Sequence, residues 1–279
     1  MSQAKEIAMP STAANSSILR RLLKQVEVPY ALISGFTFFA LWQIGVDAFD
    51  VPAYLLPSPL AVLGDLINDW ELLLSQSGVT LLEIGLGFVV SIAIALPLAV
   101  LFTYSQTFEK LIYPLIVGTQ TIPKVAVAPL FLVWFGFGLL PKIIIVTLMT
   151  FFPIVINAVV GLKSLNLQTV YLAQSMGASP WQVFWNFRLP NALPSIFAGL
   201  KVASVLAVIG AIVAEFVGAD SGLGYLIVVA ATDQNVTRQF SAIFLLSLTG
   251  ILLFGLIGYL ERRLLPWHAS VRRDTAPGH

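Results

Sequence analysis

Two charged side chains lie inside long apolar runs of this sequence and are its best candidates for chemistry. Lys124 stands between Pro123 and Pro129, and Glu215 stands three residues before Gly218. A charge at membrane depth is costly and usually marks the pathway of a solute or ion. A lysine near the membrane surface can instead extend its ammonium group out of the lipid. Both interpretations of Lys124 stay open at this point.

Glu215 also has two interpretations, because it lies near the predicted outer end of its apolar run. Its carboxylate either lines an outer gate or caps a helix that begins in the loop Gly218–Gly224. Glu83, at the start of another apolar run, is predicted to lie at the membrane interface without a role in transport.

A stripe of small residues precedes Glu215. Ala203, Ala207 and Ala211 recur every four residues and so fall on one helix face. Small residues let a second helix approach closely, which makes plain packing one interpretation of the stripe. The sharper interpretation is that Ala207 and Ala211 line a translocation path or the seam of a dimer.

Other kinds of chemistry lack the residues they need. The chain has no cysteine, and its two histidines, His268 and His279, fall near the C-terminal end. Thiolate nucleophiles and histidine-based metal or acid–base centres are therefore not expected. No G-x-x-x-x-G-K-[ST] phosphate loop occurs, so the chain is not expected to bind ATP in the usual way. The net charge of +1, without a basic cluster, gives no reason to expect nucleic acid as a partner.

The elements that hold these residues must be membrane helices. The 279-residue chain is 58% hydrophobic and only 10% charged, with a mean hydropathy of +0.90, which is too little charged surface for a soluble domain. A spanning helix needs about 20 mostly apolar residues. We predict an all-α integral membrane protein with six spans, at Tyr30–Phe49, Val79–Thr103, Leu111–Phe135, Ile143–Leu162, Ser195–Val217 and Phe240–Leu260.

The ends of the chain and one outer loop complete this prediction. Residues 1–29 are polar and lack the apolar core of a cleavable signal peptide, so we predict a cytoplasmic tail that is partly disordered. A single membrane domain follows over residues 30–265, and residues 266–279 form a second cytoplasmic tail. Ser58 followed by Pro59 is typical of a helix start, which predicts a short amphipathic helix Pro59–Asn68 on the outer surface.

Positive charge orients the predicted spans. With the N-terminus inside, 12 of the 15 lysines and arginines fall on the cytoplasmic face. Lys142 and Arg238 fall outside, and Lys124 lies within a span. Because cytoplasmic loops of membrane proteins carry an excess of Lys and Arg, both termini are predicted to be cytoplasmic.

A polar segment of about thirty residues interrupts the apolar runs on this cytoplasmic side. We predict a short helix from Leu167 to Met176, ended by Gly177 in the left-handed conformation. Ser179 and Gln182 form a capping box for a second short helix, which starts at Pro180 and is predicted to stop at Pro190. Two short helices that meet at a glycine would make a compact knob. The alternative is an ordinary interfacial loop anchored by its aromatic side chains, Trp181, Phe184, Trp185 and Phe187.

The segment resembles the signature loop of importer-type ABC permeases, which reads EAA, three residues, G, nine residues, I-x-L-P. Ala173, Gly177, Leu189 and Pro190 fit at the required spacings. Tyr171, Leu172 and Phe187 depart from the pattern in a way that is similar to the branch importing nitrate, sulfonates and taurine. The likeness extends from about Leu56 to His268 and includes three further stretches: Thr121–Gly136, Ala198–Lys201 and Ala214–Tyr225.

This resemblance implies a type I ABC importer permease fold and a transport mechanism. Two copies would pair as a homodimer in the bacterial inner membrane, and each knob would enter a groove on an ATPase subunit, which would carry ATP and Mg. A soluble binding protein would deliver a small solute at the outer face. The coupling residues implied are Tyr171, Ala173, Gly177, Ala178, Ser179, Arg188, Leu189 and Pro190.

The resemblance leaves the solute open, from nitrate, taurine and alkanesulfonates to pyrimidine vitamin precursors. The ending Pro266-Trp267-His268 looks like that of the precursor importers and favours a small organic solute.

An ion-coupled secondary transporter is the alternative function, but it would predict inverted repeats and mid-membrane carboxylates. No repeat is evident, and the carboxylates lie near span ends.

Overall fold

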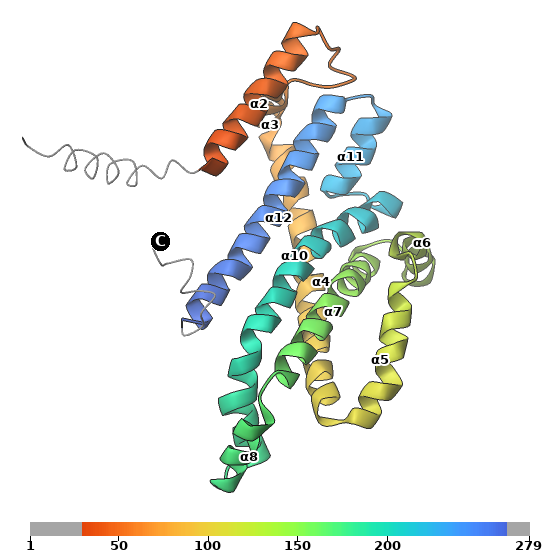
Figure 1. Ribbon diagram of the computed structural model, residues 1–279. Helices are drawn as coiled ribbons and strands as arrows, with labels where there is room; N and C mark the ends of the chain where they lie inside the picture. Colours follow the sequence, from red (N-terminus) through yellow and green to blue (C-terminus); the bar gives the residue numbers. More distant parts are fainter. Residues whose placement is uncertain (1–29, 267–279) are drawn as a thin grey trace, which may run out of the picture. The chain divides into compact units, whose positions relative to one another are not determined.

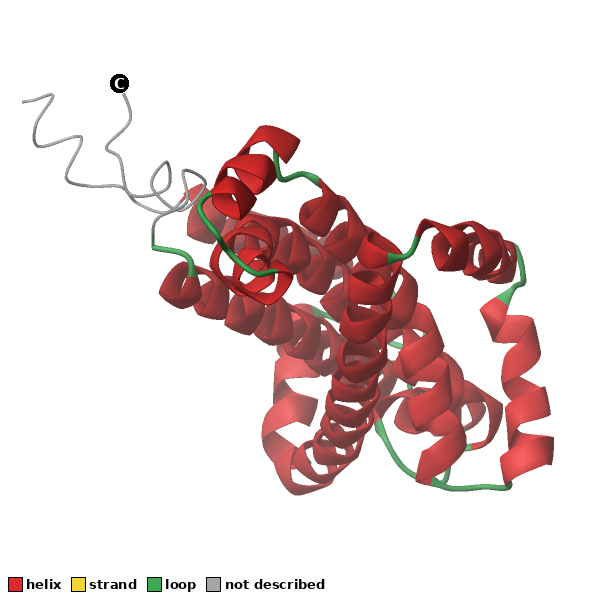
Figure 2. Cartoon of the chain, turned by 90° about the horizontal axis from the view of Figure 1, so that it is seen from below, coloured by secondary structure: helices red, strands yellow, loops and turns green. Residues whose placement is uncertain are grey.

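The computed structural model describes residues 30–266, and every regular element among them is a helix (Figure 2). The chain divides into two compact units, residues 1–60 and 61–279. The predicted tails lie outside the described residues, apart from Pro266.

The first unit holds α2 (Tyr30–Ala48) and the loop that follows it. The side chain of Gln43 closes this loop. Its amide nitrogen donates to both carboxylate oxygens of Asp47 at 3.0 and 2.8 Å, and its oxygen accepts the backbone N–H of Leu60 at 3.2 Å. The predicted short helix follows as α3, with the expected bounds Pro59–Asn68.

Three long helices form the centre of the second unit: α4 (Trp70–Tyr104), α7 (Leu139–Lys163) and α10 (Leu189–Gly218) (Figure 1). Helices α7 and α10 approach closely because glycines stand where they meet. A Cβ added to Gly199 would lie 2.9 Å from the carbonyl oxygen of Pro153, and one added to Gly161 would lie 2.8 Å from that of Ala192. The backbones are therefore too near for any side chain at these two positions.

Two further helices complete the bundle at its C-terminal end. Helix α11 (Leu223–Thr232) is short and apolar, and α12 (Val236–Leu264) packs on both α10 and α11. Arg238, in the first turn of α12, binds the carboxylates of Asp65 in α3 and Asp69, with its Nε 3.0 Å from both oxygens of Asp65. These ion pairs fix the Ala61–Asn68 part of α3 to α12.

The described residues contain four helices long and apolar enough to cross a membrane: α4, α7, the continuous helix Pro180–Gly218 and α12. Each includes one predicted span and extends beyond it by several residues. The first predicted span corresponds to α2, which has 19 residues.

The predicted span Leu111–Phe135 is divided between two helices. Helix α5 (Gln106–Gln120) and helix α6 (Lys124–Phe135) meet at a bend of 99°, and the pair counts as one broken span at most. Pro123 explains the break, since it has no N–H to continue the helix and it disfavours the α conformation at Ile122. Its own backbone is extended, with ψ 99°.

Candidate functional site

The polar segment forms a helical hairpin whose turn is built on Gly177. Helix α8 (Leu167–Ser175) ends there with φ of +88° at Gly177, a conformation that glycine adopts without strain. Gly177 N–H donates to Gln174 O at 2.9 Å, and Ala178 N–H donates to Ala173 O at 3.0 Å. This pair of hydrogen bonds defines a Schellman motif, so the predicted conformation of Gly177 is confirmed.

The second arm of the hairpin begins with the predicted capping box. Ser179 Oγ accepts the N–H of Gln182 at 3.3 Å, and Gln182 Oε1 accepts the N–H of Ser179 at 2.8 Å. Helix α9 (Pro180–Val183) follows, and a small apolar core joins it to α8. The core consists of Val170, Ala173 and Val183, with Leu165 and Ala178 packed against it. Ala173 and Ala178 therefore hold the hairpin together.

The outer surface of this hairpin is apolar and uncovered in the described chain. Tyr171 is 64% exposed, Met176 80% and Trp181 68%. Ser179 and Gly177 are also exposed. Exposed aromatic and methionine side chains at this density are typical of a surface that meets another protein or the membrane interface. We call the exposed set Leu167, Tyr171, Leu172, Met176 and Trp181 the knob surface.

The prediction that Pro190 stops the second short helix is wrong. Residues Phe184–Arg188 form a π-helical segment, η1, which continues directly into α10 at Leu189. The N–H of Leu189 bonds to Phe184 O, five residues back, and this wider turn removes the clash that a proline ring makes with a regular helix. Leu189 and Pro190 are half-buried and join the hairpin to α10.

Arg188 is half-buried at the base of the hairpin. Its guanidinium carbon lies 5.3 Å from the centre of the Tyr104 ring, at the end of α4. Such a distance is typical of a cation–π contact. The guanidinium group of Arg188 therefore contacts the Tyr104 ring of the same chain.

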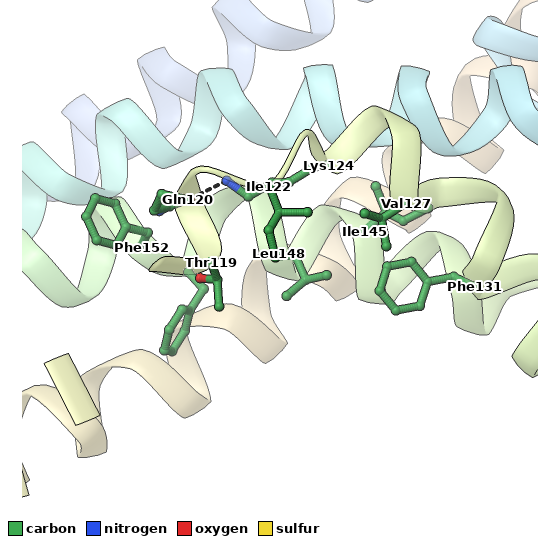
Figure 3. A pocket seen from close by; sticks show the side chains of 10 residues that line it. Thr119, Gln120, Ile122, Lys124, Val127, Phe131, Ile145, Leu148 and Phe152 are labelled. Atoms are coloured by element: carbon green, nitrogen blue, oxygen red, sulfur yellow. Dashed lines mark hydrogen bonds between the residues drawn. The ribbon is translucent and has the colours of Figure 1, made fainter. Parts of the chain in front are cut away.

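Lys124 lies at the edge of a hollow at the bend between α5 and α6. Its Nζ donates to Gln120 Oε1, and the hollow has a volume of about 190 Å³ (Figure 3). Its polar lining comes from Thr119, Gln120 and Lys124, and most of the remaining lining comes from apolar side chains of α6 and α7. Lys124 is thus half-buried and forms part of the wall of the hollow.

Glu215 is buried, 2% exposed, and its carboxylate holds the start of α11. Oε2 accepts the N–H of Gly224, and Oε1 accepts the hydroxyl of Thr80 in α4 at 2.7 Å. Thr80 in turn accepts the N–H of Leu223 at 2.8 Å. The carboxylate therefore occupies the place of a cap for a helix that starts beside the loop Gly218–Gly224.

Glu83, predicted to lie at the membrane interface, is buried within the helix bundle. Glu83 is fully buried on α4, and its Oε1 lies 2.6 Å from Nζ of Lys142 on α7, which is only 5% exposed. Lys142, expected outside the membrane, lies in the first turn of α7, which begins at Leu139. A buried lysine and a buried glutamate reduce each other's desolvation cost when they pair. Oε2 of Glu83 has no hydrogen-bond partner among the described residues.

Ala207 and Ala211 are fully buried, at 0% exposed each, together with Ala203. They belong to the main cluster of buried apolar residues of the helix bundle. The nearby Gly210 meets the backbone of Val146 on α7, where an added Cβ would lie 3.0 Å from the Cα atom. The small-residue stripe thus packs within the helix bundle.

Sequence reasoning missed the group that Thr80, Glu83, Lys142 and Glu215 form. The signal was present in part, because each residue stands in or beside an apolar run and polar residues are costly there. Pairing them requires the packing of α4, α7 and α10, which no local pattern contains. Within residues 30–266, no three His, Cys, Asp or Glu side chains gather as a metal site would need.

Residues 87–266 match the model of one protein family, the binding-protein-dependent transport system inner membrane components. The chain is 42% identical over 228 residues to the formylaminopyrimidine transport permease protein ThiX of Halalkalibacterium halodurans, covering 81% of this chain and 91% of the relative. It is 38% identical to the riboflavin transport system permease protein RibX of Chloroflexus aurantiacus, covering 82% and 86%. The taurine transport system permease protein TauC of Escherichia coli is 31% identical, covering 69% and 70%.

A solved structure has the same fold. The MetNI methionine ABC transporter in inward-facing conformations contains a chain that superposes with a TM-score of 0.59 at 21% identity, covering 70% of this chain and 97% of that one. The matched family covers most of the chain, including the knob, the hollow, Lys142 and Glu215. The chain belongs to the binding-protein-dependent transport system inner membrane component family and is the permease subunit of an ABC importer, whose ATPase is a separate protein.

Proposed function

We propose that this permease imports a small pyrimidine-type heteroaromatic solute across a bacterial inner membrane. The observation that carries this choice is the 42% identity, over 91% of its length, to a permease named for formylaminopyrimidine. The riboflavin permease at 38% identity also transports a heteroaromatic compound by name. Permeases named for aliphatic sulfonates, at 29% and 33%, and for taurine, at 31%, are less similar.

The proposed assembly has two copies of this chain, two ATPase subunits and a soluble binding protein. Each knob surface enters a groove on an ATPase subunit, which holds the ATP and Mg. The exposed apolar side chains Tyr171, Met176 and Trp181 support this assignment, since they have no cover in the described chain. Gly177 and Ser179 shape the tip, and Arg188 positions its base through Tyr104.

In the proposed orientation the chain spans the membrane six times with both termini in the cytoplasm. Helix α2 is the first span, and the α5–α6 pair is the third. Lys110 in α5 and Lys163 in α7 lie on the cytoplasmic side with the knob, and the group of Arg238, Asp65 and Asp69 lies outside. The positive-inside rule supports this arrangement, because most basic residues then face the cytoplasm. In this orientation Glu215 and Thr80 lie near the outer end, where they hold α11 as part of an outer gate.

Family membership decides against the alternative of an ion-coupled secondary transporter.

Coupling to an ATPase can be tested directly. The permease is purified from its native membrane with its ATPase and binding protein, and reconstituted in proteoliposomes with ATP inside. We expect ATP-dependent uptake of labelled formylaminopyrimidine that exceeds uptake of taurine at least tenfold. Equal uptake of both, or uptake of taurine alone, would contradict the proposed solute.

A further inference from the structure

The hollow at the bend between α5 and α6 has the composition of a solute site. Its walls are largely apolar and include three aromatic rings, from Phe131 on α6 and from Phe151 and Phe152 on α7 (Figure 3). Its few polar groups lie together at one end, on Thr119, Gln120 and Lys124. Small-molecule sites in proteins combine mostly apolar walls with a few convergent polar groups in this manner.

The polar groups at this end offer hydrogen-bond donors. Lys124 has three N–H donors and gives one to Gln120 Oε1, which leaves the amide nitrogen of Gln120 as a further donor. The hydroxyl of Thr119 already donates its hydrogen to Ile116 O at 2.6 Å, so it offers only an acceptor. No aspartate or glutamate lines the hollow, and none of the ion pairs in residues 30–266 includes Lys124. The charge of Lys124 is therefore available to a ligand.

Donors and a positive charge at the hollow favour a ligand with hydrogen-bond acceptor atoms, and the start of α6 strengthens this preference. Pro123 is the N-cap residue of α6 and supplies no side-chain acceptor for the first N–H groups of the helix. An uncapped helix start carries a partial positive charge. Lys124 is the first residue of this helix, so the positive charges of its ammonium group and of the helix start belong to neighbouring parts of the chain.

We infer that this hollow binds the transported solute on its way through the permease, with Lys124 and Gln120 donating to acceptor atoms of a small flat ring and the aromatic side chains packing on its faces. The inference rests on the proposed function, because a pyrimidine with a carbonyl substituent has this chemistry: ring nitrogens and an oxygen as acceptors on a flat body.

The test uses the absence of cysteine from the chain. In Thr119→Cys, the only thiol of the permease lies in the wall of the hollow. The permease–ATPase complex in nanodiscs is treated with a small water-soluble thiol reagent, with and without formylaminopyrimidine or taurine. Ser75→Cys, at an exposed position on α4 outside the hollow, is the control. We expect the imported solute to slow modification at position 119 at least fivefold and to leave position 75 unchanged.

Lys124 variants then test the recognition. In the Thr119→Cys background, Lys124→Met should raise the solute concentration for half-protection about 10- to 100-fold, the factor expected for loss of a hydrogen bond to a charged group. Lys124→Arg keeps the charge and the donors and should retain most of the protection. Lys110→Met removes a lysine of α5 outside the hollow and should have no effect.

The outcomes separate this inference from the proposed function. Uptake in proteoliposomes identifies which solute is imported, independently of the cysteine measurement. The inference is overturned if the imported solute, whichever it is, fails to protect the cysteine at position 119 from modification. It is also overturned if the solute protects this cysteine equally well with methionine or lysine at position 124. If taurine is imported and protects in a manner that depends on Lys124, the site is supported and the proposed pyrimidine solute is wrong.

Discussion

Lys142 on α7 and Glu83 on α4 form an ion pair, 2.6 Å from Nζ to Oε1, in which neither side chain is more than 6% exposed. Removing one partner of such a pair leaves an uncompensated buried charge, at a cost of about 3–5 kcal/mol. We therefore expect Lys142→Met to lower the stability of the purified permease strongly. The effect can be measured by heating the permease in detergent and recording how much monodisperse protein remains at each temperature.

Two controls test whether the loss comes from the unpaired charge. The double variant Glu83→Gln with Lys142→Met removes both charges and should recover most of the stability. Lys163→Met breaks the exposed pair with Glu109, whose members are 40% and 25% exposed, and should cost about 0–1 kcal/mol. Equal losses in Lys142→Met and Lys163→Met would contradict the importance of burial.

Gly177 is expected to be essential for its backbone conformation and not for lack of space. An added Cβ at this position meets nothing within 4 Å, but φ is +88° and the N–H bonds to Gln174 O. Gly177→Pro removes that bond and cannot adopt the angle, so solute uptake per ATP hydrolysed should fall at least tenfold. Gly177→Asn should keep most of the coupling, since asparagine tolerates the left-handed conformation. Unchanged uptake by Gly177→Pro would rule out the coupling role of the hairpin.

Thr80 is expected to matter more than other buried threonines, because its hydroxyl serves another helix. It donates to Glu215 and accepts from Leu223, whereas the hydroxyl of Thr249 donates only to Leu245 O of its own helix. Thr80→Val leaves a buried carboxylate oxygen and a backbone N–H without a partner, at a cost of about 1–3 kcal/mol. Thr249→Val should cost less. Hydrogen exchange of residues 222–226 measures the local effect, and equal protection in both variants would contradict it.

Gly222 should not accept a side chain. Its φ is +111°, and an added Cβ would lie 2.1 Å from Glu215 Oε1. Gly222→Ala is expected to displace the carboxylate and free the start of α11. Gly64→Ala, on α3 where an added Cβ meets nothing within 4 Å, is the control and should be neutral or slightly stabilising. We expect reduced ATP-dependent uptake with Gly222→Ala only, and normal uptake by this variant would count against a gating role for this group.

Local patterns predicted several elements closely. The capping box at Ser179 and Gln182 and the conformation of Gly177 follow from hydrogen bonds within a few residues, so the sequence contains all that they require. The bounds of α3 follow for the same reason. Hydropathy located four spans but not their ends, because α4 continues for several residues beyond its apolar centre.

Features that depend on distant partners were not predictable. Glu83 looks interfacial from its place near the start of an apolar run, and only the packing of α4 against α7 brings Lys142 to it. Pro190 looks like a helix stop, because the sequence gives no sign that a π-helical segment precedes it. The size of the bend at Pro123, 99°, was also not predictable, since a proline in an apolar run can produce a gentle kink as well as a sharp break.

The π-helical segment Phe184–Arg188 makes the second arm of the hairpin and α10 a single helix of 39 residues, Pro180–Gly218. At 1.5 Å per residue this helix follows a path about 58 Å long, with the knob at one end and the Glu215 carboxylate near the other. In the proposed assembly, movement of the hairpin by the ATPase would reach the start of α11 along this one continuous helix, without crossing a loop.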